Sequence, residues 1–311
     1  MELIRGLHNI RPRHNGCVGT IGAFDGVHCG HQQLISQLLV KARELNVPAL
    51  VVCFEPLPRE YFAPGDAPAR IMSFAEKTRH LENLGLDRIL RIKFNEALSK
   101  MSAAEFVDDI LVAKLGIRHL VIGDDFRVGK NREGDADFLI EHGAKAGYTV
   151  SPTDSITVAG QRVSSSLIRK MLGEAQFEDV AAMLGRPYSI VGKVVYGRQL
   201  GRGLGVPTAN LELHRFKSPL AGVYIVDVTL ADGRRFSGVA NVGTRPTIGD
   251  RTKANLEVHL LDFAEDIYGK TIEVHFKERL RDEKKFASLD ELKSTIYQDI
   301  HQARNWLAQQ N

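Results

Sequence analysis

One stretch decides the fold of the first half of this chain: Gly22-Ala23-Phe24-Asp25-Gly26-Val27-His28-Cys29-Gly30-His31. A short apolar run, Val18 to Ile21, precedes it, and from His31 onward the apolar residues recur with the 3.6-residue period of an amphipathic helix. A second apolar run, Ala49 to Phe54, follows the helix and is typical of a buried strand. The order of strand, glycine-containing turn, helix and strand predicts a βαβ unit.

The two histidines of this stretch fall where the predicted helix begins. A helix N-terminus carries unpaired N–H groups and the positive end of the helix dipole, which together attract phosphate. Residues three apart lie on one helical face, so His28 and His31 can reach the same ligand. Two other interpretations are open: both are surface residues, or they form a metal pair with Cys29 as a third ligand. No second Cys/His cluster with metal-ligand spacing occurs in the sequence, so the pattern favours phosphate binding.

Length, charge and cysteine content limit the functions of the chain. At 311 residues it should form about two domains. The net charge is +3 and no run of Lys and Arg reaches five residues, so we expect neither nucleic acid nor a membrane as a partner. No apolar run suits a signal peptide or approaches the ~18 residues of a membrane-spanning helix. Cys17, Cys29 and Cys53 cannot all pair within the chain, which favours a reducing cytoplasm, and the oligomeric state is left open.

The first 184 residues alternate short apolar runs with helical patterns. This alternation predicts an α/β domain with a parallel, doubly wound, Rossmann-like sheet. It stops at Gly185-Arg186-Pro187, so we place a linker at residues 185–188, between domains 1–184 and 189–311. Further helices are expected around Phe74–Leu84 and Ala103–Leu115, and further strands near Ile89-Leu90, Leu120–Ile122 and Tyr148–Val150.

The residues after the linker change to a period of two. Several short strands with no interleaved helix predict a small antiparallel β-barrel. The expected strands are Ile190–Tyr196, Val223–Leu230, Phe236–Asn241, Leu256–Leu261 and Ile272–Phe276. The chain closes with a helix that begins at a capping box, Ser288 to Glu291. We expect its apolar stripe to pack on the barrel, and that stripe consists of Leu289, Leu292, Ile296, Ile300, Ala303 and Leu307.

Two further segments of the first domain are candidates for ligand binding. Gly123 to Lys130 is not a P-loop, because five residues separate its glycines and Asn131 stands where Ser or Thr is needed. It reads instead as a polar loop at a strand end, which is where open parallel sheets bind ligands. Ser164-Ser165-Ser166 precedes a predicted helix and can cap it, and Arg169, one turn in, adds a charge for phosphate oxygens.

A glycine-rich motif, Gly197 to Asn210, begins the second domain. No helix follows its glycines, so it is not a dinucleotide-binding fingerprint. It is either a hairpin loop or a flap whose backbone approaches phosphates, and the residues alone do not choose between the two. Thr208 and Asn210 carry the hard oxygen donors that suit Mg²⁺.

Three motifs together resemble one enzyme family, over essentially the whole chain. Phe24 to His31 resembles the HxGH signature of nucleotidylyltransferases, in the form typical of the bacterial bifunctional riboflavin kinase/FMN adenylyltransferase (FAD synthetase) family. Val163 to Arg169 resembles the Ser-Ser-Thr-x-Ile-Arg motif of that family, and Pro207 to Asn210 resembles the signature of riboflavin kinases. Ala23 and Leu57 replace residues often seen as Asn and His in the family, so we assign neither a catalytic role.

The resemblance implies that the first domain transfers an adenylyl group. The FMN phosphate would attack the α-phosphorus of ATP in line and pyrophosphate would leave, so no enzyme nucleophile is required. His28 and His31 would hold the phosphates, Arg169 the leaving pyrophosphate, and Mg²⁺ would neutralise further charge. Asp125 and Phe126 would contact the flavin. The remaining implied nucleotide contacts are Gly22, Phe24, Asp25, Gly30, Ser164, Ser165 and Ser166.

The resemblance implies that the second domain phosphorylates riboflavin to FMN. A kinase needs a base for the acceptor hydroxyl, and Glu257 and Glu273 stand in near-identical contexts, which chemistry alone does not separate. The resemblance selects Glu257, which would accept the proton of the ribityl 5′-hydroxyl as that oxygen attacks the γ-phosphorus of ATP. The further contacts that it implies are Arg202, Thr208 and Asn210 to ATP, the last two through Mg²⁺, and Arg281 to the flavin.

The expected function is therefore FAD synthesis from riboflavin and ATP, with FMN as product of the first step and substrate of the second. One alternative is a nucleotidylyltransferase with another phosphate acceptor, which the kinase-like second half disfavours. The other is a flavin-binding sensor that keeps the fold without the chemistry, which the intact set of His28, His31, Thr208, Asn210 and Glu257 disfavours.

Overall fold

The computed structural model describes residues 1–197, 203, 205–213, 215, 217–246 and 252–310. The chain divides into two compact units. The first contains Met1–Pro68 and Phe74–Ser164, and the second contains Ala69–Ser73 and Ser165–Asn311. Each unit has its own sheet and its own apolar interior, so each is described separately.

The first unit is built on a six-stranded sheet in the order β1-β4-β3-β2-β5-β6. Every neighbouring pair of strands is parallel, which confirms the predicted sheet. The sequence-based expectation missed the edge strand β1, which is only four residues long. The strands are β1 Glu2–Arg5, β2 Cys17–Ile21, β3 Ala49–Glu55, β4 Arg88–Lys93, β5 Ile117–Gly123 and β6 Thr149–Thr153.

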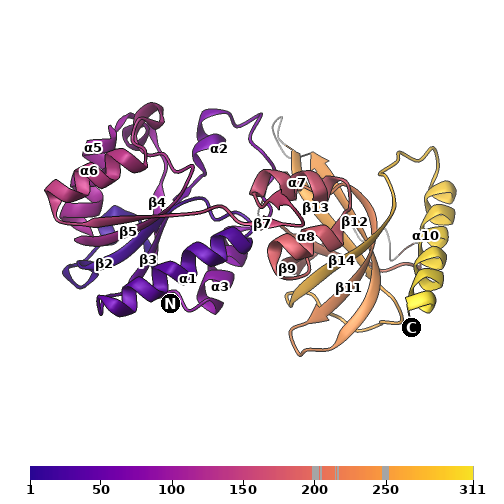
Figure 1. Cartoon of the computed structure of the whole chain (residues 1–311). Helices are drawn as coiled ribbons and strands as arrows, with labels where there is room; N and C mark the ends of the chain where they lie inside the picture. The colour runs from indigo at the N-terminus through magenta and orange to yellow at the C-terminus, as the bar shows by residue number, and fades with distance from the viewer. Residues whose placement is uncertain (198–202, 204, 214, 216, 247–251, 311) are drawn as a thin grey trace. The chain divides into compact units, whose positions relative to one another are not determined.

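Helices cover both faces of this sheet. α1 and α3 lie on one face, and α5 and α6 lie on the other (Figure 1). Burial of Leu34, Ile35, Leu38 and Ala42 confirms the apolar face predicted for α1. The helix expected over Ala103–Leu115 begins as α5 and continues as the π-helix η3. The bounds are α1 Cys29–Glu44, α2 Pro58–Phe62, α3 Phe74–Asn83, α4 Glu96–Lys100, α5 Ala103–Phe106, η3 Val107–Lys114 and α6 Ala136–Ala146.

Short elements complete the first unit. They are the 3₁₀ turns η1 Leu7–Asn9, η2 Pro12–His14 and η4 Lys130–Arg132, and the two-residue strands β7 Thr157–Val158 and β8 Gln161–Arg162.

The second unit is a closed antiparallel barrel in the order β10-β13-β12-β11-β14-β9, as predicted. The expectation missed β10, because its four residues directly follow Pro207-Thr208 and read as the end of a loop. Val258 and Val274 are among the side chains that fill the barrel. The strands are β9 Ser189–Val195, β10 Ala209–Glu212, β11 Gly222–Leu230, β12 Arg235–Pro246, β13 Thr252–Leu260 and β14 Thr271–Arg281.

Within the described residues, the barrel is accompanied by the helices α7 Ser165–Gly173, α8 Phe177–Leu184 and α10 Leu289–Gln310. Figure 1 shows α7 and α8 against one side of the barrel and α10 against another. The hydroxyl of Ser288 accepts the backbone N–H of Glu291 at 3.1 Å, which confirms the predicted cap of α10. The predicted apolar stripe is wrong at its first residue, since Leu289 is 65% exposed and the buried positions of α10 are Asp299 and Ala303. Contact with the barrel therefore begins beyond the first turn of the helix.

A short segment from the first half of the sequence belongs to the second unit. Two donors hold the carbonyl oxygen of Ile71: the hydroxyl of Tyr188 at 3.1 Å and Nη1 of the buried Arg215 at 3.0 Å. Nε of Arg169 donates to the carbonyl oxygen of Ala69 at 2.6 Å. The Ala69–Ser73 segment is thus fixed by side chains that come more than 95 residues later in the chain.

Candidate functional sites

The first candidate site lies at the carboxyl edge of the parallel sheet. β2 runs into the Gly22–His31 turn, β5 runs into the Gly123–Phe126 segment, and the two strands are neighbours in the sheet. From β2 the chain passes through α1 to β3, which lies on one side of β2, whereas β5 lies on the other side. The strand order therefore reverses between β2 and β5. Ligands of open α/β sheets bind at such a point. The fold therefore places two motifs that lie about one hundred residues apart at the ends of neighbouring strands.

The turn between β2 and α1 is tightly wound. Phe24, Gly26 and Val27 have φ angles of 48°, 92° and 41°, a region that non-glycine residues rarely adopt. Asp25 is buried beside them. A Cβ atom at Gly22 would come within 3.0 Å of the Phe24 ring. Strained backbone of this kind persists where the surrounding structure holds it, and it is frequent at ligand sites.

The two histidines are held against each other. The imidazole rings of His28 and His31 stack with a centroid distance of 3.7 Å. His28 caps α1, because its Nδ1 accepts the backbone N–H of His31 at 3.3 Å, and the ring therefore carries its proton on Nε2 when neutral. A Cβ at Gly30 would lie 3.3 Å from the His28 ring. Gly30 thus leaves room for the stacked pair.

His31 is poised to act as a neutral ring. Burial lowers the pKa of His31 well below its ordinary value of 6.5, and the charges of His28 and Lys77 lower it further. Its Nδ1 atom is buried and has no hydrogen-bond partner among the described residues. An atom of this kind, at a helix N-terminus, is free to bond with a ligand.

No group of three or more His, Cys, Asp or Glu side chains in the described part of the chain could hold a metal ion. Cys29 therefore does not complete a metal site of that size with the two histidines there. Cys17, Cys29 and Cys53 form no disulfide with one another.

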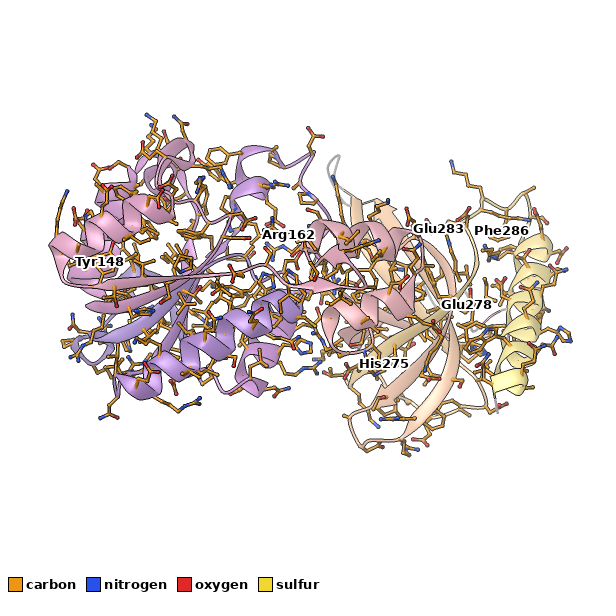
Figure 2. The ribbon with its side chains drawn as sticks, in the orientation of Figure 1. Tyr148, Arg162, His275, Glu278, Glu283 and Phe286 are labelled. Carbon is orange, nitrogen blue, oxygen red and sulfur yellow. The ribbon has the colours of Figure 1, made fainter. Side chains whose placement is uncertain are left out.

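Asp125 and Phe126 lie in the loop that follows β5. The neighbouring Asp124 fixes this loop, because its carboxylate accepts the hydroxyl of Ser155 at 2.7 Å and Nη2 of Arg162 at 2.8 Å. Arg162, which is labelled in Figure 2, has its Nη2 atom 3.7 Å from the carboxylate of Asp125. Asp125 is exposed and Phe126 is half-buried, so both side chains are available at the carboxyl edge of the sheet.

An aromatic cluster at the same edge was not predicted from the sequence. Tyr61 and Phe62 of α2 lie with ring centroids 5.3 and 5.6 Å from that of Phe94, which follows β4, and Phe54 at the end of β3 lies 5.7 Å from Phe94. Phe62 is 66% exposed, which is unusual for so large an apolar side chain. In the sequence, the adjacent aromatic residues Tyr61 and Phe62 stand in an otherwise polar segment, and this signal could have identified the surface.

The Ser164–Arg169 motif spans the division between the units. Ser164 is the last residue of the first unit, and Ser165 begins α7 in the second, as the predicted helix requires. Within the second unit, Nε of Arg169 is held by the carbonyl oxygen of Ala69. The prediction that Ser164, Ser165, Ser166 and Arg169 bind a nucleotide stays a prediction.

The second candidate site is on the outer face of the barrel. Asn210 of β10, Glu257 of β13 and Asn241 of β12 lie opposite one another in register, and such residues point to the same face of a sheet. That face is the outer one, because Leu256 and Val258, on either side of Glu257, are buried. The carboxylate of Glu257 accepts the side-chain amide of Asn255 at 3.0 Å.

Glu273 occupies a different part of the barrel. It lies on β14 opposite Val191 and Thr229, and its carboxylate accepts the hydroxyl of Ser189 at 2.6 Å. Of the two glutamates that the sequence left equivalent, only Glu257 lies beside Asn210.

Thr208 lines a pocket of about 340 Å³ next to this row. The walls are partly apolar, with Val194, Phe263 and Ile267, and partly aromatic, with Tyr268, whose ring stacks on Tyr196 at 4.0 Å. His259 fixes the approach to the pocket, since its Nδ1 bonds to the carbonyl oxygen of Pro207 at 2.8 Å. A carbonyl can only accept, so the ring proton is on Nδ1.

Arg281 makes a bidentate ion pair with Asp299 of α10, at 2.9 Å from Nε and 2.8 Å from Nη2. Asp299 is only 4% exposed. The guanidinium is therefore engaged within the protein, and its predicted contact with flavin stays a prediction. Arg202, the predicted ATP contact, lies outside the described residues.

Comparisons with known proteins match both halves of the chain. A family model described as FAD synthetase matches residues 10–167, and one described as riboflavin kinase matches residues 184–307. A protein of Pseudomonas fluorescens named bifunctional riboflavin kinase/FMN adenylyltransferase is 50% identical over 304 residues, which cover 98% of this chain and 97% of that protein. Proteins of the same name from Escherichia coli K12 and Haemophilus influenzae are 43% and 44% identical, with 98% of each chain covered.

A solved structure has the same fold. The crystal structure titled as a macrolide-efflux protein from Streptococcus pneumoniae superposes with a TM-score of 0.77 at 29% identity, covering 98% of this chain and all of that one. In the described part of the present chain, no helix is long and apolar enough to cross a membrane. With two matching family models and relatives at 43–50% identity over nearly its full length, the chain belongs to the bifunctional riboflavin kinase/FMN adenylyltransferase family.

Proposed function

We propose that this chain makes FAD from riboflavin in two ATP-dependent steps. Its riboflavin kinase domain phosphorylates riboflavin to FMN, and its adenylyltransferase domain joins FMN to the AMP portion of ATP. The observation that carries this function is the presence, in one chain, of a stacked histidine pair at the switch point of a parallel sheet and of the Asn210–Glu257 row on a barrel.

In the adenylyl-transfer step, an oxygen of the FMN phosphate attacks the α-phosphorus of ATP. The bond from that phosphorus to the bridging oxygen of the β-phosphate breaks, and pyrophosphate leaves. His28 donates from Nε2 and the neutral ring of His31 donates one N–H, so both stabilise charge on the phosphate oxygens. The unpaired N–H groups of the first turn of α1 add to this effect. Ser164, Ser165, Ser166 and Arg169 would bind the departing pyrophosphate.

The flavin ring of FMN would lie against the carboxyl edge of the sheet. Asp125 and Phe126 of the β5 loop offer a polar and an aromatic contact there. The exposed ring of Phe62, supported edge-on by Tyr61 and Phe94, offers a flat apolar platform of the kind on which large aromatic ligands stack. The backbone of the turn would shape the nucleotide site, at Gly22, Phe24, Asp25 and Gly30.

In the kinase step, Glu257 would accept the proton of the ribityl 5′-hydroxyl as that oxygen attacks the γ-phosphorus of ATP and ADP leaves. The pocket beside Thr208 has the size and the aromatic wall to hold the adenine ring of ATP. Asn210 of β10 and Glu257 of β13, which lie next to this pocket, would then face the phosphates.

Mg²⁺ fits the donors at this second site. The side chain of Asn210 is 5% exposed and lies so close to the backbone of Gly197 that a Cβ there would collide with the amide. Asn210 thus stands in a space that only glycine leaves open, with the hydroxyl of Thr208 two residues away. These are oxygen donors of the kind that Mg²⁺ prefers. When bound with ATP, the ion would neutralise phosphate charge.

The domain limits and the location of the enzyme remain part of the proposal. We place the adenylyltransferase domain at residues 1–184, the linker at 185–188 and the kinase domain at 189–311. A cytoplasmic location is supported by the three cysteines, which form no disulfide with one another, since oxidising compartments favour disulfides.

One experiment tests the function as a whole. The protein is incubated with riboflavin, ATP and Mg²⁺, and FMN and FAD are resolved by chromatography. Both products are expected. A flavin-binding sensor would form neither product, and an adenylyltransferase for another acceptor would form FMN without FAD.

A further inference from the structure

Lys77 is a lysine whose side chain is almost entirely buried. It lies in the first turn of α3 and is only 2% exposed. Its ammonium makes no hydrogen bond or ion pair with any residue in the described ranges. A lysine buried to this degree is almost always paired, because removing its charge from water is costly.

The position of Lys77 points to the adenylyl-transfer site. α3 and α1 lie on the same face of the sheet, and in a parallel α/β fold the first turn of each helix faces the carboxyl edge (Figure 1). His31 lies in the first turn of α1, and the charge of Lys77 contributes to the lowered pKa of His31. The unpartnered Nδ1 of His31 and the ammonium of Lys77 thus occur in one neighbourhood.

A second cation reinforces the first. Nζ of Lys77 lies 5.8 Å and the guanidinium carbon of Arg91 lies 5.2 Å from the centroid of the Phe74 ring. The side chain of Arg91 likewise forms no hydrogen bond or ion pair within the described residues. Both charges act on the buried Cys53, which lies opposite Arg91 in the register of β3 and β4. The carboxylate of Glu55 also acts on Cys53, with the opposite sign. Two like charges near one ring repel each other, and a bound anion relieves this repulsion.

We infer that Lys77 is a catalytic residue of adenylyl transfer, whose ammonium contacts the phosphoryl oxygens of ATP. This inference rests on the adenylyl-transfer activity proposed above. As the FMN oxygen bonds to the α-phosphorus and the bond to the pyrophosphate oxygen breaks, negative charge shifts onto the oxygens around the reaction centre. Lys77 stays protonated throughout and donates hydrogen bonds to these oxygens, so no proton is transferred. Arg91, which also lies near the Phe74 ring, raises the positive potential at the site.

The competing explanation is structural. A lysine can bury its aliphatic stem while its ammonium reaches solvent, and then it stabilises packing without touching a ligand. The two explanations differ in what an uncharged side chain of similar length does to each of the two reactions.

The test uses the full chain with the substitutions K77M, K77Q and K77R. FAD formation from supplied FMN and Mg-ATP is measured beside FMN formation from riboflavin in the same preparation. K77M and K77Q are expected to lower the first rate by about 100- to 1000-fold, the effect of removing one transition-state donor, and to leave the second within about twofold. K77R, which keeps the charge, is expected to retain most of the wild-type rate of FAD formation. K145M, at an exposed lysine of α6, is the matched control and should change neither rate.

Each other result decides against the inference. FAD formation at the wild-type rate in K77M or K77Q would show that the ammonium does not act in catalysis. Parallel loss of both reactions in K77M and K77Q would assign Lys77 a structural role, and so would K77R as inactive as K77M. A wild-type protein that forms no FAD from FMN would instead refute the adenylyl-transfer function itself, so the two failures are distinguishable.

Discussion

The backbone N–H of His31 donates to Nδ1 of His28, while the two rings stack at 3.7 Å. His28 therefore has two tasks that can be separated by mutation: it caps α1, and it presents Nε2 to a ligand. An Asn side chain can replace the cap but not the ring nitrogen.

We predict that H28A and H28N both lower FAD formation from FMN by at least about 100-fold, because both remove one donor to the phosphates. Only H28A should lose stability, by about 1 kcal/mol, since Asn is a good N-cap and Ala is not. Urea unfolding and the FAD assay measure the two effects. Equal stability of the two variants would contradict the capping role of the ring.

The lowered pKa of His31 predicts a pH dependence of stability. The folded protein resists protonation of this ring, whereas the unfolded chain takes up a proton near pH 6.5. The contribution of His31 is thus fully present above pH 6.5 and is lost as the pH falls from there towards the folded pKa. The slope for one proton reaches at most about 1.4 kcal/mol per pH unit. The free energy of unfolding of wild type and H31N, measured from pH 8 to 5, should diverge below pH 6.5. Parallel curves would rule this out.

Glu257 and Glu273 offer a matched pair for the kinase step. We predict that E257Q lowers FMN formation from riboflavin by about 100- to 10,000-fold, the range for loss of a general base, and leaves FAD formation from supplied FMN unchanged. E273Q should affect neither rate strongly, because Glu273 lies on a different part of the barrel. A kinase rate in E257Q close to wild type would remove Glu257 as the base.

The Arg281–Asp299 pair is predicted to hold α10 on the barrel. D299A leaves Arg281 without its bidentate acceptor and should lower the free energy of unfolding by about 1.5–3 kcal/mol, the contribution of a charge-assisted hydrogen bond. D290A, at an exposed position of the same helix, is the control. Urea unfolding measures both. Identical midpoints for the two variants would show that the pair contributes nothing to stability.

Periodicity explains which parts of the fold were predictable. The parallel sheet and the barrel follow from apolar patterns that run over five or more residues, such as Ala49–Phe54 and Val223–Leu230. β1 and β10 were missed because four residues are too few to show a period. Leu289 was wrongly predicted to pack on the barrel. Helical spacing shows which face of a helix is apolar, but not at which residue the contact of that face with the barrel begins.

The candidate sites were predictable where the residues are contiguous. The His28–His31 turn and the Thr208–Asn210 motif read directly from the sequence. The Phe54–Tyr61–Phe62–Phe94 cluster did not, since it comes from three separate segments that meet only at the carboxyl ends of β3 and β4. Lys77 could not be identified from the sequence either. Only its burial, and the lack of an ion pair within the described residues, distinguish it from other lysines.

The Ala69–Ser73 segment constrains the order in which the chain can fold during its synthesis on the ribosome. Ile71 is synthesised 117 residues before Tyr188 and 144 residues before Arg215, the two side chains that later hold its carbonyl oxygen. The nascent first half must therefore carry an undocked segment until much of the barrel has been made. All residues of the first unit have been made once synthesis reaches Ser164, whereas the second unit, which includes this segment, cannot be built from residues 165–311 alone.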